Sequence, residues 1–280
     1  MTPTADSPIG VFDSGAGGLS VLRAIRARLP NESTLYFGDQ QHVPYGLRAT
    51  EQIQRLSETI ARFLLARDVK IVVIACNTAS AAALKFLRDK FPHVRFVGME
   101  PAVKPAAERT RTGKVGVLAT PATFQGELYA SVIGRFANGV ELYQSACEGL
   151  VQQIERGDLT GNETRRILHD ALKPMAAKQV DVVVLGCTHY PFVIPLIQEI
   201  AGADVQVIDP APAVARQVER LLEADRLKNA SAALGTAEFF TSGDPSAFSD
   251  LLSLLLGETS AVKQARWSAD LQTLSARNAY

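Results

Sequence analysis

One stretch decides the fold of this chain, the sequence VDVVVLGCTHYP at residues 180–191. Its apolar run of β-branched residues and leucine is too short for a helix and is typical of a strand buried on both faces. The run stops at Gly186, and a thiol, a hydroxyl and an imidazole follow at Cys187, Thr188 and His189. Because ligands bind at the carboxyl ends of strands in parallel α/β sheets, this stretch predicts a ligand site at such an edge.

An earlier stretch, KIVVIACNTAS at residues 70–80, repeats this pattern. Here too a hydrophobic run ends in a small residue, and Cys76 is followed directly by Asn77 and Thr78. We therefore expect two strands, each of which delivers a thiol at its carboxyl end.

The first and second parts of the chain show the same order of predicted strands. The strand predicted at 9–12 matches one at 115–118, the strand at 34–39 matches one at 140–145, and the two cysteine strands match in the same order. This order predicts two pseudo-symmetric three-layer αβα domains with mainly parallel sheets and an active site in the cleft between them. A further strand at 237–244 is expected to complete the first domain. Residues 261–280 are interpreted as an appended tail without chemistry.

Two loops near the amino terminus suit a carboxylate ligand. The first, DSGAGG at residues 13–18, places glycines before a helical segment, so free N–H groups would point at a bound anion. It lacks the GxGxxG register, which disfavours nucleotide binding. The second, QQHVPYG at 40–46, offers the Tyr45 hydroxyl and exposed backbone amides, although an ordinary loop with a packed tyrosine is the alternative.

Two thiols on opposite sides of one cleft favour a particular chemistry. One thiolate could remove a proton from a stereocentre while the other thiol delivers a proton to the opposite face. Asp13 could assist Cys76, and His189 could assist Cys187. Each residue also has a purely structural interpretation, as a small core side chain, a helix cap or a hydrogen-bonded loop histidine.

Composition excludes several other functions. Lys plus Arg and Asp plus Glu number 29 each, so no global field favours nucleic acid or an anionic membrane as a partner. We expect neither a signal peptide in residues 1–7 nor a membrane-spanning segment. Three cysteines without CxxC spacing indicate reduced thiols in the cytoplasm, and Cys147 is interpreted as structural.

No metal site is predicted. His42, His93 and His169 lack the spacing of metal ligands. A zinc site built from Cys76, Cys187 and His189 would have suitable ligand types and is the weaker interpretation.

Four motifs together resemble the glutamate racemases of the aspartate/glutamate racemase superfamily. They are DSGAGGLSV at 13–21, PYG at 44–46, ACNTA at 75–79 and LGCTHYP at 185–191. The resemblance implies a cytoplasmic, homodimeric isomerase without a cofactor, which interconverts L- and D-glutamate for peptidoglycan synthesis in the cell wall.

The resemblance also implies roles for individual residues. Cys76 would deprotonate D-glutamate with help from Asp13, and Cys187 would deprotonate L-glutamate with help from His189. An acidic residue downstream of the middle cysteine would assist His189.

Two residues compete for that acidic role. Glu155 has the better spacing from Cys147, and Glu148 is the alternative, because the sequence has Cys147-Glu148 where a Cys-Pro pair is common in the family. The implied substrate contacts are hydroxyls, amides and loop backbone at Asp13, Ser14, Tyr45, Gly46, Asn77, Thr78, Thr120, Thr123, Thr188 and His189.

The resemblance implies a first domain of residues 1–98 and 212–280, with a second domain of 99–211 inserted. Three other functions stay open. One is a racemase for aspartate or another amino acid, the second is a hydrolase or amidase that uses Cys187 and His189, and the third is a non-catalytic amino-acid-binding protein.

Overall fold

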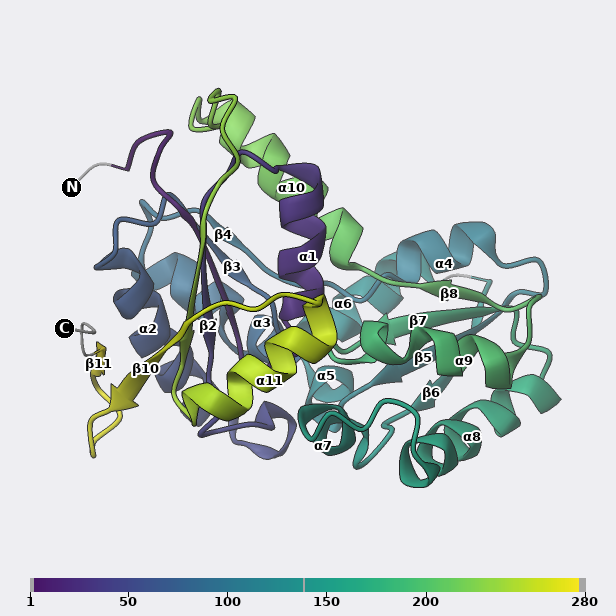
Figure 1. Cartoon of the computed structure of the whole chain (residues 1–280). Helices are drawn as coiled ribbons and strands as arrows, with labels where there is room; N and C mark the ends of the chain where they lie inside the picture. The colour runs from purple at the N-terminus through teal and green to yellow at the C-terminus, as the bar shows by residue number, and fades with distance from the viewer. Residues whose placement is uncertain (1–2, 138, 277–280) are drawn as a thin grey trace. The chain divides into compact units, whose positions relative to one another are not determined.

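The computed structural model, which describes residues 3–137 and 139–276, divides into two compact units. The first joins Met1–Met99 to Ala211–Tyr280, and the second is Glu100–Pro210. Each unit has its own sheet with helices on both faces (Figure 1). The α/β class with mainly parallel sheets is thereby confirmed.

The sheet of the first unit has the strand order β11-β10-β9-β2-β1-β3-β4. All neighbouring strands are parallel except β10 and β11, which are antiparallel. The strands are β1 Ile9–Asp13, β2 Thr34–Gly38, β3 Ile71–Ile74, β4 Phe96–Val97, β9 Ala237–Thr241, β10 Val262–Trp267 and β11 Leu274–Ala276. Every residue of β1, β2 and β3 is buried, as continuous apolar runs predict.

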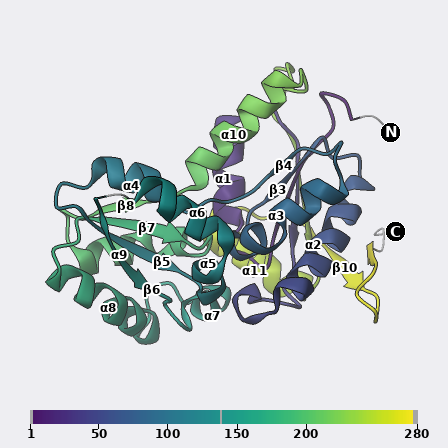
Figure 2. The same ribbon diagram turned by 180° about the vertical axis from the view of Figure 1, so that it is seen from behind.

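Helices cover both faces of this sheet. On one face α2 and α3 pack together over Phe12 and Ile74, and on the other α1 contacts α10 and α11 (Figure 2). The amphipathic face of α2 buries Ile53, Leu56 and Ile60, which recur at helical spacing. The elements are α1 Leu19–Arg28, the 3₁₀ turn η1 Tyr45–Leu47, α2 Thr50–Leu65, α3 Asn77–Lys90, α10 Ala211–Ala224 and α11 Pro245–Leu256.

The second unit has a four-stranded parallel sheet in the order β6-β5-β7-β8. Helices α4 and α6 pack over one face, and α8 contacts α9 on the other (Figure 1). The strands are β5 Lys114–Ala119, β6 Glu141–Ser145, β7 Val182–Gly186 and β8 Gln206–Ile208. The helical elements are α4 Val103–Arg109, α5 Pro121–Gln125, α6 Glu127–Phe136, α7 Leu150–Glu155, α8 Asn162–Ala177, η2 Tyr190–Val193 and α9 Ile194–Ala201.

The register of the parallel strands gathers polar residues at one edge of each sheet. In the first unit Phe12 pairs with Phe37 and Ile74, so Asp13, Asp39 and Cys76 follow at the same edge. In the second unit Ala119 pairs with Gly186, so Thr120 and Cys187 emerge together.

The carboxyl-terminal segment differs from the expected appended tail. As predicted, β9 pairs with β2 and extends the first sheet, but β10 then pairs in parallel with β9. The segment is therefore an integral part of the sheet. Its strand β10 is half-exposed and lacks a continuous apolar run, so no local pattern predicted this pairing.

Candidate functional site

Asp13 ends β1 and organises the loop that follows. Its Oδ2 atom accepts hydrogen bonds from the backbone N–H groups of Gly15 at 3.2 Å and Gly18 at 2.9 Å. An added Cβ at Gly18 would lie 2.7 Å from the Asp13 Cβ, so the approach requires glycine. These bonds lie in the loop before α1, whose N-cap Gly18 has no side-chain cap, so Asp13 orders the loop and does not cap the helix. Its buried carboxylate lies at the edge from which Cys76 also emerges.

Cys76 lies at the boundary between β3 and α3. Its sulfur accepts a hydrogen bond from the backbone N–H of Ala79 at 3.4 Å, which makes the side chain the N-cap of α3. The hydroxyl oxygen of Ser14 lies 3.7 Å from the same sulfur. Because free N–H groups at a helix start favour negative charge, this position supports a thiolate.

Asn77 presents an amide next to this thiol. The side chain is buried, and neither its Oδ1 nor its Nδ2 atom has a hydrogen-bond partner within residues 3–137 and 139–276. Leaving such a group unpaired costs about 1–3 kcal/mol, so native structures rarely retain one without a reason. A polar ligand would supply the missing partners.

Tyr45 and Gly46 lie in η1, but the tyrosine hydroxyl is already engaged. It donates a hydrogen bond to Asp39 Oδ2 at 2.7 Å. Burial, followed by the Asp39 charge, raises the pKa of Tyr45 well above its usual range, so the hydroxyl stays protonated. The expected contribution of this loop to a ligand therefore falls on its backbone.

Cys187, His189 and Glu155 form a continuous hydrogen-bonded row in the second unit. His189 Nδ1 lies 3.7 Å from Cys187 Sγ, and His189 Nε2 lies 2.5 Å from Glu155 Oε1. Burial lowers the pKa of the imidazole, but its hydrogen bonds and charge interactions with Cys187 and Glu155 outweigh this and raise that pKa well above normal. An imidazolium can donate to both neighbours, so the row suits a thiolate, a cation and a carboxylate.

The two candidates for the acidic position lie in different surroundings. Glu155 ends α7 beside His189, whereas Glu148 lines a cavity of about 470 Å³ together with Cys147 and Arg166. Burial raises the pKa of the Cys147 thiol to about 12, which disfavours the reactive thiolate.

Hydroxyl groups surround the carboxyl ends of β5 and β7. Thr120 is the N-cap of α5, and its Oγ1 atom lies 3.0 Å from Thr123 Oγ1. Thr188, next to Cys187, is buried. Of the expected site residues, the first unit therefore holds Asp13, Ser14, Tyr45, Gly46, Cys76, Asn77 and Thr78, and the second holds Thr120, Thr123, Glu155, Cys187, Thr188 and His189.

Sequence reasoning missed two residues at these edges. Asp39 accepts the Tyr45 hydroxyl, and Tyr190 is fully buried with its own hydroxyl donating to the backbone carbonyl of Ala146 at 3.5 Å. Burial, followed by the neighbouring Cys187 charge, raises the pKa of Tyr190 well above normal, so the hydroxyl acts as a donor. Asp39 directly follows β2, and this position at the carboxyl end of a strand could have identified it from the sequence.

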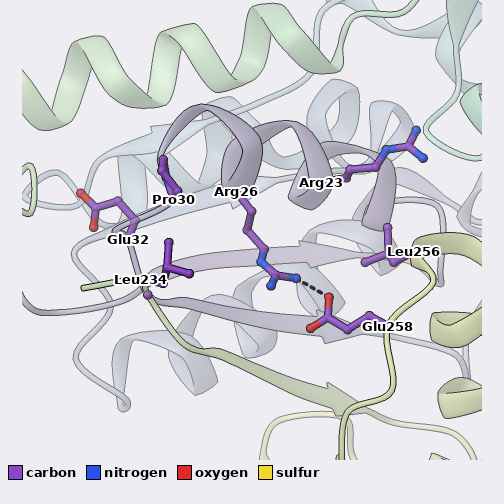
Figure 3. A pocket seen from close by; sticks show the side chains of 8 residues that line it. Arg23, Arg26, Pro30, Glu32, Leu234, Leu256 and Glu258 are labelled. Carbon is purple, nitrogen blue, oxygen red and sulfur yellow. Dashed lines mark hydrogen bonds and ion pairs between the residues drawn. The ribbon is translucent and has the colours of Figure 1, made fainter. Parts of the chain in front are cut away.

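A further cavity, of about 270 Å³, lies against α1 in the first unit. Its lining includes an ion pair between Arg26 and Glu258 (Figure 3). Neither this cavity nor the one beside Cys147 is lined by Cys76 or Cys187, so neither contains the candidate site.

Among the described residues, no group of three His, Cys, Asp or Glu side chains could hold a metal ion. Within the same ranges, no helix combines the length and apolar character needed to cross a membrane.

Known proteins similar to this chain are racemases. The family model of Asp/Glu/hydantoin racemases matches residues 9–218. A glutamate racemase of Pseudomonas paraeruginosa is 50% identical over 256 residues, which cover 91% of this chain and 96% of the relative. The crystal structure of glutamate racemase isoform RacE1 from Bacillus anthracis matches with a TM-score of 0.85 and 32% identity, covering 95% of this chain and 98% of the other. Glutamate racemase from Francisella tularensis, solved with D-glutamate, matches with a TM-score of 0.79 and 32% identity, covering 92% and 97%.

Proposed function

The chain belongs to the Asp/Glu/hydantoin racemase family, and from this membership we propose that it interconverts L- and D-glutamate without a cofactor. It is an isomerase. We propose glutamate rather than aspartate as the substrate, because the relatives that share about half of this chain's residues are glutamate racemases. Aspartate, which is one methylene shorter, is the alternative substrate.

The observation that carries this proposal is the pair of equivalent cysteine sites. Cys76 and Cys187 each follow the carboxyl end of a buried parallel strand. Asp13 lies at the same sheet edge as Cys76, and His189 contacts Cys187 directly. A hydrolase needs only one nucleophilic thiol, whereas a racemase needs an acid or base for each face of the α-carbon.

In the proposed reaction the two sulfurs exchange roles. With D-glutamate, the Cys76 thiolate removes the α-proton and the electron pair remains on the α-carbon as a carbanion. The Cys187 thiol then gives its proton to the opposite face, which yields L-glutamate and a Cys187 thiolate. The reverse reaction starts from that thiolate. Asp13 assists proton transfer at Cys76, and His189 with Glu155 stabilises the charge at Cys187.

Substrate recognition is assigned to neutral polar groups. The buried amide of Asn77 offers an acceptor for the ammonium and a donor for a carboxylate. The backbone at Tyr45 and Gly46 provides further N–H donors. The remaining contacts are proposed for Asp13, Ser14, Thr78, Thr120, Thr123, Thr188 and His189.

The purified protein is expected to abolish the circular dichroism of L-glutamate at neutral pH without pyridoxal phosphate. In buffered D₂O the product enantiomer should carry deuterium at its α-carbon, because the donating thiol exchanges with solvent. L-aspartate, tested in parallel, should retain its signal. Loss of the aspartate signal alone would assign the other substrate, and release of ammonia from glutamine would indicate an amidase.

Replacing Glu155 with glutamine should shift the alkaline limb of the pH profile to lower pH. The carboxylate helps to raise the pKa of His189, so the wild-type imidazolium is lost only as the pH rises through that raised value. Glutamine keeps the shape but lacks the charge, so the imidazolium is lost at lower pH. We expect kcat/KM to fall about 10²-fold at mildly alkaline pH and less at acid pH.

The measurement is kcat/KM against pH, by circular dichroism, for both enantiomers. Glu148→Gln is the matched control and should leave the profile unchanged. An alkaline limb that stays in place in Glu155→Gln, or moves in the control, would contradict the assignment of Glu155.

The same proposal extends to the cellular role. We assign the protein to the cytoplasm as a homodimer that supplies D-glutamate for peptidoglycan, with residues 1–98 and 212–280 as one domain and 99–211 as the other. The family resemblance supports these assignments, and the three free cysteines support the cytoplasmic location.

A further inference from the structure

Asp39 is a buried carboxylate that accepts hydrogen bonds from several segments of the first unit. Its Oδ2 atom accepts the Tyr45 hydroxyl at 2.7 Å, and its Oδ1 atom accepts the Ser242 hydroxyl at 2.7 Å and the Trp267 indole N–H at 2.8 Å. His42 Nδ1 lies 3.0 Å from both oxygens. The side chain is completely inaccessible, and a carboxylate is retained in such a place only when donors satisfy it.

Trp267 comes from the segment that the sequence presented as a tail. It ends β10, and its ring lies edge-on to His42 with centroids 5.3 Å apart. It also packs against the core cluster that contains Tyr45 and Cys76. The indole therefore donates a hydrogen bond to Asp39, which precedes the loop of residues 40–47, and its ring contacts His42 within that loop.

The loop between Asp39 and η1 is held by further bonds in the same network. The backbone N–H of Gln41 donates to Ser242 Oγ at 2.9 Å, and Arg48 Nε donates to the carbonyl of His42 at 2.7 Å. Because the Tyr45 hydroxyl is bonded to Asp39, the position of the η1 backbone follows the position of this carboxylate. Cys76 and Asp13 are close enough to Tyr45 for their charges to affect it.

We propose that Trp267 is a positioning residue for glutamate binding, which acts through Asp39 to fix the Tyr45–Gly46 turn. This inference rests on the proposed function, in which the backbone of that turn holds a substrate carboxylate. Trp267 itself touches no reacting atom. Fixing the turn before glutamate arrives lowers the entropic cost of binding, so the effect falls on affinity.

The test is a comparison of KM with kcat. Trp267→Phe keeps a ring beside His42 but lacks the N–H donor, and we expect KM for both enantiomers to rise about fivefold while kcat stays within about twofold, the pattern of lost uniform binding. Ser242→Ala removes a different donor from the same carboxylate and should reproduce this split. It keeps the inference testable if the tryptophan variant folds poorly.

Thr59→Val is the matched control. The Thr59 hydroxyl donates to the carbonyl of Leu271 at 3.0 Å, so this variant loosens the same carboxyl-terminal segment without touching Asp39. A merely structural role would raise KM in the control as well. Unchanged KM in both Trp267→Phe and Ser242→Ala, or an equal rise in Thr59→Val, would overturn the inference.

Calorimetric titration of D-glutamate separates this inference from the proposed function. We expect the dissociation constant to rise in Trp267→Phe by the same factor as KM. If the wild type is active and Trp267→Phe binds D-glutamate with the same dissociation constant, only the positioning role would be overturned. A wild-type protein that neither binds nor racemises glutamate would overturn the proposed function and this inference with it.

Discussion

Replacing either Cys76 or Cys187 with serine is expected to lower kcat/KM for glutamate racemisation by about 10³-fold or more, because a serine hydroxyl is a far weaker acid than a thiol. The loss must be equal for the two enantiomers. Their equilibrium constant is one, so kcat/KM cannot differ between the two directions in any variant. Circular dichroism with each enantiomer measures both values.

Hydrogen exchange at the α-carbon can distinguish the two thiols. In D₂O the Cys187→Ser variant retains Cys76, so it should slowly exchange the α-proton of D-glutamate without inverting it. Cys76→Ser should do the same with L-glutamate. Proton NMR of the α-hydrogen follows this exchange, and the opposite pattern would reverse the assignment of the two cysteines.

Cys147 provides the matched control for these substitutions. Burial raises the pKa of its thiol to about 12, and nothing in the proposed reaction uses it. Cys147→Ser should racemise glutamate at close to the wild-type rate. If Cys76→Ser or Cys187→Ser retained racemisation within about tenfold of wild type, the two-base mechanism would be wrong, because a positioned acid or base contributes at least about 10².

Much of the fold could be predicted because its central strands are encoded locally. β3 and β7 are short continuous apolar runs, and a cysteine follows the end of each within two residues. The side chains of such strands are buried on both faces, so the continuous apolar run can be recognised without knowing which elements pack against it. The glycine loop after Asp13 is equally local, since the carboxylate binds N–H groups only two and five residues away.

The contacts of Asp39 could not be predicted in this way. Its donors Ser242 and Trp267 lie more than 200 residues further along the chain. Strand pairing brings them together, and no local pattern specifies that β10 lies beside β9. For the same reason the sequence left Glu155 and Glu148 as alternatives, because only the position of α7 determines which carboxylate meets His189.

Asn77→Leu is expected to weaken activity while the fold becomes no less stable. Leucine has nearly the shape of asparagine, and it removes a buried amide that lacks partners among the described residues. It is also a better helix former at the start of α3, where the Cys76 sulfur rather than Asn77 provides the cap. Loss of hydrogen bonds to a charged substrate should lower kcat/KM about 10²-fold.

Ser57→Ala separates the two effects. Ser57 Oγ is likewise buried without a hydrogen-bond partner in the described part of the chain, but it lies within α2 and has no place in the proposed reaction. Both variants should unfold at or above the wild-type temperature, and only Asn77→Leu should lose racemisation. An Asn77→Leu protein that keeps its activity, or that unfolds well below the wild type, would mean that the amide serves the protein core. Opposite changes in stability and turnover would mark Asn77 as a group whose partner is the substrate.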